Sequence, residues 1–431
     1  MYFTQQDIEK RRARLTLKWD AVLNDDEAVL IYSGDPVQKP GGLDQTYPFL
    51  PHPAYYWLTG RRREGEVLCY NKNTGWTGFQ KQPAKEEAVW EGVRNDLLVI
   101  SPGRPLQELE GYLQTQQYSA IYELGQTGRP LAPGKTIELR TLLDQTKRVK
   151  DAAEIALIRQ VAAIAERGYE KLEQVLMPGI CEKELQLLFE TEIVRNGAHT
   201  VPYETIVGAG SNSAILHALP TQRTIGENEF VLIDAGAAVF DYCVDITRTF
   251  GSSHSMDSRH KMLYELVLKV QLSCIGMTLP GAPWHAVHMH AAESFTTGLL
   301  ELGILKGGME ELLSSEVIRL FFPHGVGHLV GLGVRDTGQE ERRDNRSYYG
   351  SRLRVDLALE PGHLITVEPG LYFIPALLND AELRNRYKNN INWQELEYWM
   401  EIGGVRIEDN ILLTDGGNEN LTGGINKQET I

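Results

Sequence analysis

The segment Val231–Phe250 constrains the fold of this 431-residue chain more than any other stretch. It consists of an apolar run, a turn region and a second apolar-rich run, and it contains Asp234 and Asp245. An ionised carboxylate inside an apolar strand is costly unless it is paired or bound to a metal ion. If the turn centres near residues 239–240, the two aspartates lie opposite each other on one face of a hairpin. A cation between them would remove their mutual repulsion, although aspartates that serve only turns or salt bridges fit this segment equally well.

Three later segments carry further metal-ligand residue types in apolar or glycine-rich surroundings. His324 and His328 lie four residues apart in the run Phe321–Gly333, whose glycines allow the backbone to approach a ligand closely. Glu368 ends an apolar strand directly before a Pro-Gly turn, and Glu408 lies within another apolar strand. Taken singly, the histidines could be satisfied core residues, and each glutamate could be a salt-bridged strand residue.

Together these segments provide an oxygen-rich ligand set with one imidazole: Asp234, Asp245, His328, Glu368 and Glu408. Four negative charges match two divalent cations, and such ligation suits Mn²⁺, Co²⁺ or Zn²⁺ better than a soft-metal site. Two neighbouring metal ions can hold a bridging hydroxide and polarise a carbonyl group. The ligand set therefore predicts a two-metal hydrolase. Arg406 alternates with Glu408 along one strand face and is expected to be its ion-pair partner.

Composition excludes several other classes of protein. The formal net charge of −15 argues against nucleic-acid and anionic-membrane partners, which both require a basic face. The four cysteines form no C-x-x-C pair, which argues against a disulfide framework or a structural zinc site. No apolar run approaches the length of a membrane span. The N-terminus has no apolar signal-peptide region, so a cytoplasmic location is expected. The P-loop, H-E-x-x-H and G-x-S-x-G motifs are all missing from the sequence.

The length favours two domains. Residues 1–146 alternate strands and helices and predict a small α/β domain, whereas residues 147–431 predict an α+β domain of helices on an antiparallel sheet. Expected helices of the first part are 5–20, 84–94 and 105–116, and its expected strands are 27–33, 55–58, 66–70 and 97–100. In the second part, helices are expected at 151–176, 181–196, 257–278 and 284–303, strands within 200–250, and strands and loops from residue 321 onward.

These ordered motifs resemble the aminopeptidase P/prolidase branch of the pita-bread metallopeptidases, peptidase family M24B. The five ligand residues coincide one by one with the family's dinuclear metal ligands, and the resemblance covers nearly the whole chain. It implies a pita-bread catalytic domain at 147–431 and a smaller creatinase-type α/β domain at 1–146. It also implies two divalent ions, with Mn²⁺ first and Co²⁺ or Zn²⁺ as alternatives, and a homodimer or higher homo-oligomer.

The resemblance further implies roles for residues around the metals. His217 resembles a histidine that helps to hold the scissile peptide, and His324 resembles one that contacts the substrate or leaving group. Tyr203 resembles an active-site tyrosine. Glu368 would be both a ligand and a proton shuttle, and Arg406 would orient the Glu408 side of the site and contribute to the substrate region.

The resemblance leaves the peptide length open. The segment Ile391–Leu396 and the position of Arg354, which aligns with a carboxylate-binding arginine of prolidases, favour an Xaa-Pro dipeptidase. An Xaa-Pro aminopeptidase that acts on longer proline-containing peptides is the alternative, and an inactive pita-bread scaffold is a third reading. Arg335 departs from the family, because it stands where a histidine usually precedes Asp336. It could weaken catalysis, or it could bind a substrate carboxylate as a permanent cation.

Overall fold

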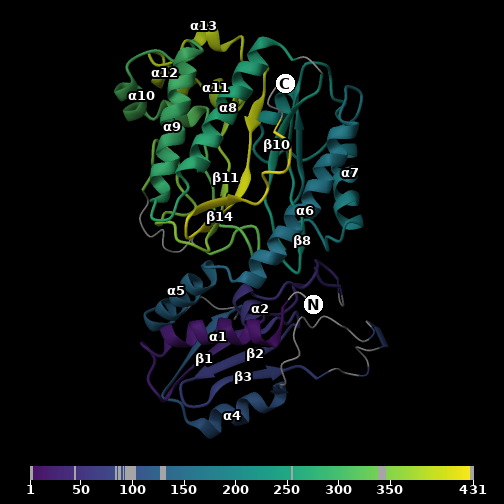
Figure 1. Ribbon diagram of the computed structural model, residues 1–431, viewed down its shortest axis with the longest axis vertical. Coiled ribbons are helices and arrows are strands. Elements are labelled where there is room, and N and C mark those ends of the chain that lie inside the picture. Colours follow the sequence, from purple (N-terminus) through teal and green to yellow (C-terminus); the bar gives the residue numbers. More distant parts are fainter. Residues whose placement is uncertain are drawn as a thin grey trace. The chain divides into compact units, whose positions relative to one another are not determined.

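The computed structural model describes residues 3–42, 45–82, 85, 89–90, 92, 103–126, 133–253, 256–337 and 346–427. The chain divides into two compact units, Met1–Arg148 and Val149–Ile431. This division lies two residues beyond the boundary expected from the sequence. The first unit is coloured purple to blue in Figure 1, and the second runs from blue through green to yellow.

The first unit is a five-stranded sheet with helices. Its described helices are α1 (Gln5–Trp19), α2 (Pro53–Thr59), α4 (Leu109–Gln116) and α5 (Lys135–Arg148). Its described strands are β1 (Glu27–Tyr32), β2 (Val67–Asn71), β3 (Gly75–Gln80), β4 (Arg104–Pro105) and β5 (Ala120–Gly125). The strand order is β4-β3-β2-β1-β5, and only the β1–β5 and β3–β4 pairs are parallel. α1 begins with a capping box in which Thr4 and Asp7 satisfy each other's backbone amides.

The prediction of a strand at 55–58 is wrong, because these residues lie in α2. Their aromatic side chains favour strands by propensity. The local helix signals outweigh that preference: His52 caps the first turn, Pro53 occupies a position where its missing N–H is harmless, and Gly60 ends the helix with a left-handed φ of 66°. β3 and β5 were not expected from the sequence. The predicted strand at 97–100 and most of the predicted helix at 84–94 lie outside the described residues.

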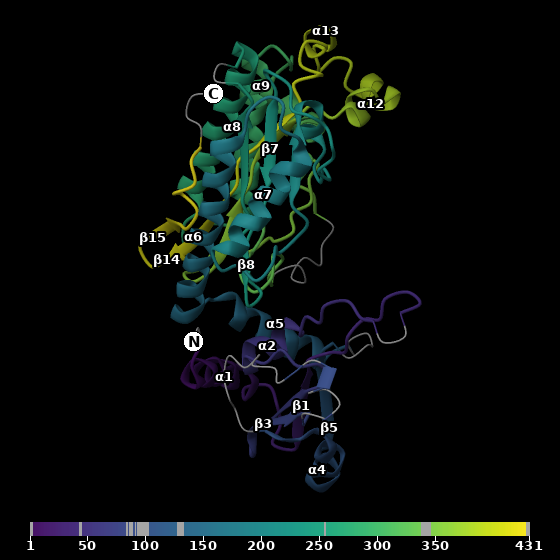
Figure 2. The ribbon, with the colours of Figure 1, turned by 90° about the vertical axis from the view of Figure 1, so that its right-hand side faces the viewer.

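The second unit carries long helices to either side of several short strands (Figures 1 and 2), and its described strand pairs are all antiparallel. Its longer helices are α6 (Ala152–Val175), α7 (Glu182–Arg195), α8 (Ser258–Met277) and α9 (Trp284–Glu301). Its shorter helices are η2 (Gly210–Ala214), α10 (Met309–Ser315), η3 (Val317–Leu320), α11 (Pro375–Leu378), α12 (Ala381–Arg386) and α13 (Trp393–Leu396). The four long helices match the predicted ones, whereas α11 to α13 fall where only strands and loops were expected.

The strands of the second unit form separate small sheets. Their bounds are β6 (Ile206–Ala209), β7 (Phe230–Asp234), β8 (Ala238–Val239), β9 (Tyr242–Cys243), β10 (Thr247–Gly251), β11 (Leu364–Val367), β12 (Gly370–Tyr372), β13 (Gly404–Arg406), β14 (Asp409–Thr414) and β15 (Gly417–Asn420). Among the described residues the sheets are β10-β7-β6, β11-β14-β15, β12-β13 and β8-β9. Isolated bridges join them, including Thr247 to Glu408 and Leu329 to Ile365.

The hairpin of β7 to β10 exists, but its turn is one residue later than predicted. Phe240 and Asp241 form the turn with φ of 51° and 64°, and Thr247 rather than Asp245 pairs with Asp234. Asp245 precedes Thr247 by two residues, so it is a diagonal neighbour of Asp234 on the same face. The expected juxtaposition of the two carboxylates therefore arises from a different register.

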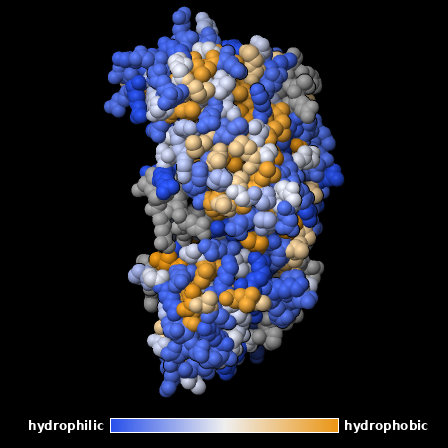
Figure 3. All heavy atoms as spheres, turned by 60° about the vertical axis from the view of Figure 1, so that its left-hand side comes forward, coloured by the Kyte–Doolittle hydropathy of each residue, from blue (hydrophilic) through white to orange (hydrophobic). Residues whose placement is uncertain are grey.

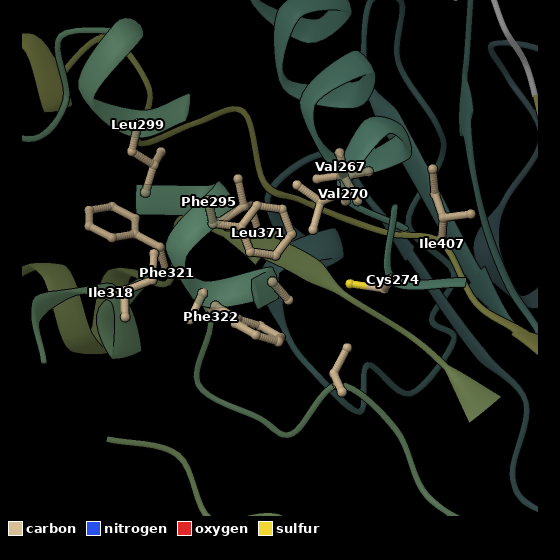
Figure 4. Packing of buried hydrophobic residues seen from close by; sticks show 14 of the residues in the cluster. Val267, Val270, Cys274, Phe295, Leu299, Ile318, Phe321, Phe322, Leu371 and Ile407 are labelled. Carbon is tan, nitrogen blue, oxygen red and sulfur yellow. The ribbon is translucent and has the colours of Figure 1, made fainter. Parts of the chain in front are cut away.

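The apolar core of the second unit lies next to the segments that carry the predicted ligands (Figure 4). Phe321 and Phe322 pack into it just before His324, Leu371 follows the Glu368 turn, and Ile407 directly precedes Glu408. Side chains of α8 and α9, such as Phe295, complete the cluster. Because close packing resists displacement, this core fixes the backbone on which the ligands sit.

In the view of Figure 3, hydrophobic groups gather in several small patches that are separated by hydrophilic groups. None of the helices in the described part of the chain combines the length and apolarity needed to cross a lipid bilayer.

Candidate metal centre

The five predicted ligand residues come from four separate parts of the second unit. Asp234 ends β7, and Asp245 lies between β9 and β10. His328 lies in the glycine-rich stretch after η3. Glu368 directly follows β11, and Glu408 follows β13 after one intervening residue, Ile407. Backbone pairing joins these parts: Thr366 N–H donates to His328 O at 2.8 Å and Glu408 N–H donates to Thr247 O at 3.0 Å.

The structure brings ligand atoms of four of these five residues to one place, and Asp234 lines the adjoining cavity with Asp245. His328 Nε2 lies 3.2 Å from Asp245 Oδ2 and 3.5 Å from Glu368 Oε1. Ligand atoms of Asp245, His328 and Glu408 all lie within 4.8 Å of one another, and all three residues are buried. Glu368 is the most open of the set, with 16% of its side chain exposed. A cluster of this kind can surround a cation.

The protonation state of His328 shows why a cation fits. Its Nδ1 lies 3.0 Å from Leu329 O, which can only accept, so Nδ1 carries the proton and donates it. In the neutral ring Nε2 is then a bare lone pair, and it faces carboxylate oxygens that also only accept. His328 Nε2, Asp234 Oδ1 and Glu408 Oε1 are buried and have no hydrogen-bond partner among the described residues. Buried acceptors that converge without donors are what divalent metal ions bind.

The charges and burial of the carboxylates also favour a bound cation. Burial raises the pKa of Asp245 well above its ordinary value, and the charges of Asp234 and Glu368 raise it further. Burial likewise raises the pKa of Glu408, as do the charges of Asp245 and Glu368. Carboxylates that repel one another in a low-dielectric site are stabilised when cations neutralise them. The donor set, mostly carboxylate with one imidazole, fits two divalent ions.

Each nitrogen of the Arg406 guanidinium donates to a protein partner, and its ion-pair partner differs from the expected one. Its Nη2 donates to Asp234 Oδ2 at 2.7 Å, its Nε to Thr247 Oγ1 at 2.9 Å and its Nη1 to the Tyr372 hydroxyl at 2.9 Å. It reaches Glu408 only through Thr247, whose hydroxyl donates to Glu408 Oε2 at 2.8 Å. The prediction of Glu408 as the direct partner is wrong, because β13 faces β7 and β10 across the hairpin. The expected substrate contact of Arg406 finds no support in this arrangement.

Sequence reasoning missed Thr247 and Tyr372, which connect the ligands. Thr247 lies two residues after Asp245 on β10, so the period-two alternation of a strand could have found it. Tyr372 offered no such signal, because an aromatic residue in an apolar strand looks like core. It is buried between Arg406 and His324, and the desolvation of its hydroxyl raises its pKa to about 12.

The buried side chains of Arg248 and Asn410 support the backbone of the ligand residues. Arg248 Nη1 donates to Glu408 O at 2.7 Å and to Thr247 O at 3.0 Å, and its Nη2 donates to Asp409 Oδ1 at 2.7 Å. The Asn410 side chain accepts from Asp245 N–H at 3.1 Å and donates to Asp245 O. These contacts fix two ligand residues from behind.

His324 is held beside Glu368 in one tautomer. Its Nδ1 lies 2.9 Å from Gly325 O, so Nδ1 carries the proton, and Nε2 accepts from the Tyr372 hydroxyl at 2.8 Å. Burial lowers the pKa of His324, which favours the neutral ring. Its Nδ1 lies 3.9 Å from Glu368 Oε2. The structure thus brings His324 next to the predicted proton shuttle.

The remaining predicted residues line a cavity of about 370 Å³ that opens beside Asp234 and Asp245. Its wall includes the side chains that were expected in the substrate region: Tyr203, His217, Arg335 and Arg354. His217 is solvent-exposed in a turn after η2. Burial raises the pKa of Tyr203 well above its ordinary value. The cavity is large enough for a small ligand.

Comparisons with known proteins agree with this geometry. The model of metallopeptidase family M24 matches residues 156–415, and the aminopeptidase P N-terminal domain matches residues 8–98. A Fusarium vanettenii protein named Probable Xaa-Pro aminopeptidase is 32% identical over 399 residues, which cover 88% of this chain and 85% of that protein. An Aspergillus clavatus protein of the same name is 37% identical over 408 residues, covering 88% and 86%.

Solved structures give the same picture. E. coli aminopeptidase P with the inhibitor Pro-Leu is 26% identical, with a TM-score of 0.79 and coverage of 99% and 97% of the two chains. The Zn-substituted E. coli enzyme in complex with product has the same score and coverage, and it supports the expected use of divalent metal ions. The relatives fit the alternative expectation of an aminopeptidase better than the leading one of a dipeptidase. The chain is a metallopeptidase with the pita-bread fold, and it belongs to the aminopeptidase P family of M24B.

Proposed function

We propose that this protein is an Xaa-Pro aminopeptidase that removes the N-terminal residue from peptides whose second residue is proline. The single observation that carries the metal-dependent chemistry is the convergence of His328 Nε2, which has no hydrogen-bond partner among the described residues, with the oxygens of Asp245 and Glu368. The names of the relatives support aminopeptidase over dipeptidase activity. The proposal thus departs from the dipeptidase that Arg354 favoured.

In this proposal Asp234, Asp245, His328, Glu368 and Glu408 hold two divalent ions, with Mn²⁺ first and Co²⁺ or Zn²⁺ as alternatives. When bound, such a pair activates a water molecule and polarises the scissile carbonyl group. Asp245 would hold metal together with His328, because its Oδ2 lies 3.2 Å from His328 Nε2. Asp234 shares its second oxygen with Arg406 and is the candidate to hold one ion.

The protein residues then handle the substrate and the proton. Glu368 is the most exposed ligand, so its carboxylate can take a proton at Oε2 and pass it to the leaving imino nitrogen of proline. His324 keeps its Nδ1–H on the Glu368 side, because Tyr372 occupies its Nε2. His217 and Tyr203 line the cavity and would orient the peptide around the scissile bond.

A peptide-length series tests the proposal. Purified full-length protein is stripped of metal, reloaded with Mn²⁺, Co²⁺ or Zn²⁺, and assayed on Ala-Pro, Ala-Pro-Ala and a longer Ala-Pro peptide. We expect release of alanine from the tripeptide and the longer peptide, and none without metal. Matched Ala-Ala peptides control for proline selectivity. Cleavage of Ala-Pro alone would instead establish a dipeptidase, and the absence of cleavage with every metal would refute the function. Light scattering on the same sample tests the accompanying proposal of a homodimer or higher homo-oligomer.

A further inference from the structure

Arg335 is a cation that lies beside the predicted metal ligands, and one of its N–H donor groups has no hydrogen-bond partner among the described residues. It lines the cavity together with Asp234 and Asp245, and its charge opposes the raised pKa of Asp245. Its Nη1 is buried and has no hydrogen-bond partner among the described residues. A buried guanidinium donor without an acceptor is unfavourable, because its hydration is lost and not replaced. Such a donor in a cavity wall is suited to an acceptor that a ligand brings.

The backbone around Arg335 is fixed. Asp336 forms an ion pair with Lys150 at 2.6 Å, and both side chains are almost fully buried. Asp336 N–H donates to Leu329 O at 3.1 Å. The hairpin turn holds the same loop, since Gly333 N–H donates to Asp241 O at 2.8 Å. Arg335 is therefore positioned by an ion pair and by main-chain bonds, independently of any substrate.

The charge of Arg335 is also not needed to balance the metal ligands. Four ligand carboxylates match two divalent ions, and Arg406 is engaged by Asp234, Thr247 and Tyr372. Arg335 thus adds positive charge to the cavity wall. A planar guanidinium binds carboxylates through short, charge-assisted hydrogen bonds, whereas a neutral carbonyl gains less from it.

We propose that Arg335 is a specificity-determining residue that binds a carboxylate of the peptide substrate, so that the enzyme prefers short peptides with a free C-terminus. This inference rests on the proposed function, because it concerns the same substrate and the same cavity. A carboxylate can come from the C-terminus or from an acidic side chain, and the cavity beside the metal ligands favours the C-terminus of a short peptide.

The test compares peptides that differ only in this charge. Mn²⁺-loaded full-length protein is assayed on Ala-Pro-Ala with a free carboxylate and on its C-terminal amide. We expect a kcat/KM roughly 10 to 100 times higher for the acid, mainly through KM, since a hydrogen bond to a charged group has this strength. In Arg335→Gln the ratio falls to about 1, because the activity on the acid falls more than the activity on the amide, and the manganese content stays unchanged. The exposed Arg352 does not line the cavity, so Arg352→Gln is the matched control and keeps the wild-type ratio.

Binding gives a readout that does not depend on turnover. Calorimetry measures the affinity of the dipeptide Pro-Leu and of its amide for wild type, Arg335→Gln and Arg335→Lys. The acid binds more tightly to wild type, Gln abolishes the difference, and Lys retains part of it because the charge remains without the planar fork. Ala-Pro-Glu amide identifies the source of the carboxylate. If it recovers the rate of the acid, a side-chain carboxylate suffices; if it does not, the C-terminus is read.

Two results would overturn the inference while leaving the proposed function intact. Equal kcat/KM for acid and amide in wild type would show that no carboxylate is read. A loss of manganese in Arg335→Gln, with both peptides affected equally, would make Arg335 a supporting residue of Asp245. If no Xaa-Pro peptide were cleaved, the proposed function would fail, and the Pro-Leu pair would still decide whether Arg335 recognises a carboxylate.

Discussion

Replacing Asp409 by asparagine should destabilise the second unit strongly, although this residue touches no predicted metal ion. Its Oδ1 accepts from Arg248 at 2.7 Å and from Thr422 at 2.9 Å. Its Oδ2 accepts from Gln271 and Asn420, both at 2.9 Å, and pairs with Lys427 at 2.5 Å. One carboxylate therefore satisfies five donors from separate parts of the chain, and no part of its side chain is exposed.

The magnitude follows from the loss of the charge and of an acceptor. Asparagine keeps the shape, but it points an NH₂ group at donors and leaves the buried Arg248 without its counter-ion. Removing one partner of a buried pair typically costs about 3 to 5 kcal/mol. For a unit of this size, a change of 1 kcal/mol moves Tm by roughly 2 °C, so Tm should fall by roughly 6 to 10 °C.

The pKa of Asp409 predicts how the stability difference between wild type and Asp409→Asn changes with pH. Burial opposes ionisation of Asp409, but Arg248 and Lys427 outweigh it and hold its pKa below the ordinary value. A carboxyl whose folded pKa is depressed contributes stability above the unfolded pKa of about 3.9, and that contribution is lost as pH falls through the folded pKa. The difference between wild type and Asp409→Asn should be constant near neutral pH and shrink below about pH 4.

Scanning calorimetry of metal-free protein measures this difference without interference from metal binding. Asp415→Asn is the matched control, because Asp415 is exposed in the turn between β14 and β15, and it should change stability by less than about 0.5 kcal/mol. An Asp409→Asn protein as stable as wild type at pH 7 would refute the reasoning that this carboxylate carries the network.

Three further predictions concern the site and its surroundings. Tyr372→Phe removes the hydroxyl that donates to His324, so kcat/KM on Ala-Pro-Ala should fall roughly 10-fold at unchanged metal content, and an unchanged kcat/KM would contradict the positioning role. Asp245→Asn should reduce the bound metal measured by elemental analysis, whereas an unchanged metal content would contradict a ligand role for Asp245. Burial lowers the pKa of His288 to about 4, so the unfolded chain binds a proton first and stability falls as pH drops from about 6.5 towards 4. Urea unfolding of His288→Gln should show a weaker pH dependence over this interval than wild type, and an identical one would show that His288 does not contribute.

The convergence of the predicted ligand residues could be anticipated because their chemistry conflicts with their surroundings. A carboxylate within an apolar strand needs a partner, and Asp234, Asp245 and Glu408 each stand in such a run. The long helices were predictable for a related reason, since α6 repeats its apolar positions at helical spacing and begins with the capping residue Asp151.

Tertiary details were not predictable from these local signals. The hairpin turn uses Phe240 and Asp241 at positive φ, where glycine or asparagine is the usual signal, so the register was placed one residue early. The partner of Arg406 depends on which strands meet across the hairpin, and spacing along one strand cannot reveal that. The names of the relatives, rather than any single residue, favour the aminopeptidase alternative over the dipeptidase that Arg354 suggested.

Under the proposed function, the wide separation of the ligand residues along the chain would make the metal ions stabilise the fold as well as serve catalysis. Thr247 and Glu408 meet across 161 residues, and the ligand set exists only when the whole second unit is folded. By mass action, an ion that binds only the folded chain and is present at 100 times its Kd adds about 2.7 kcal/mol of stability. Under the proposed function, removal of metal should therefore increase the fraction of chains that open to proteases.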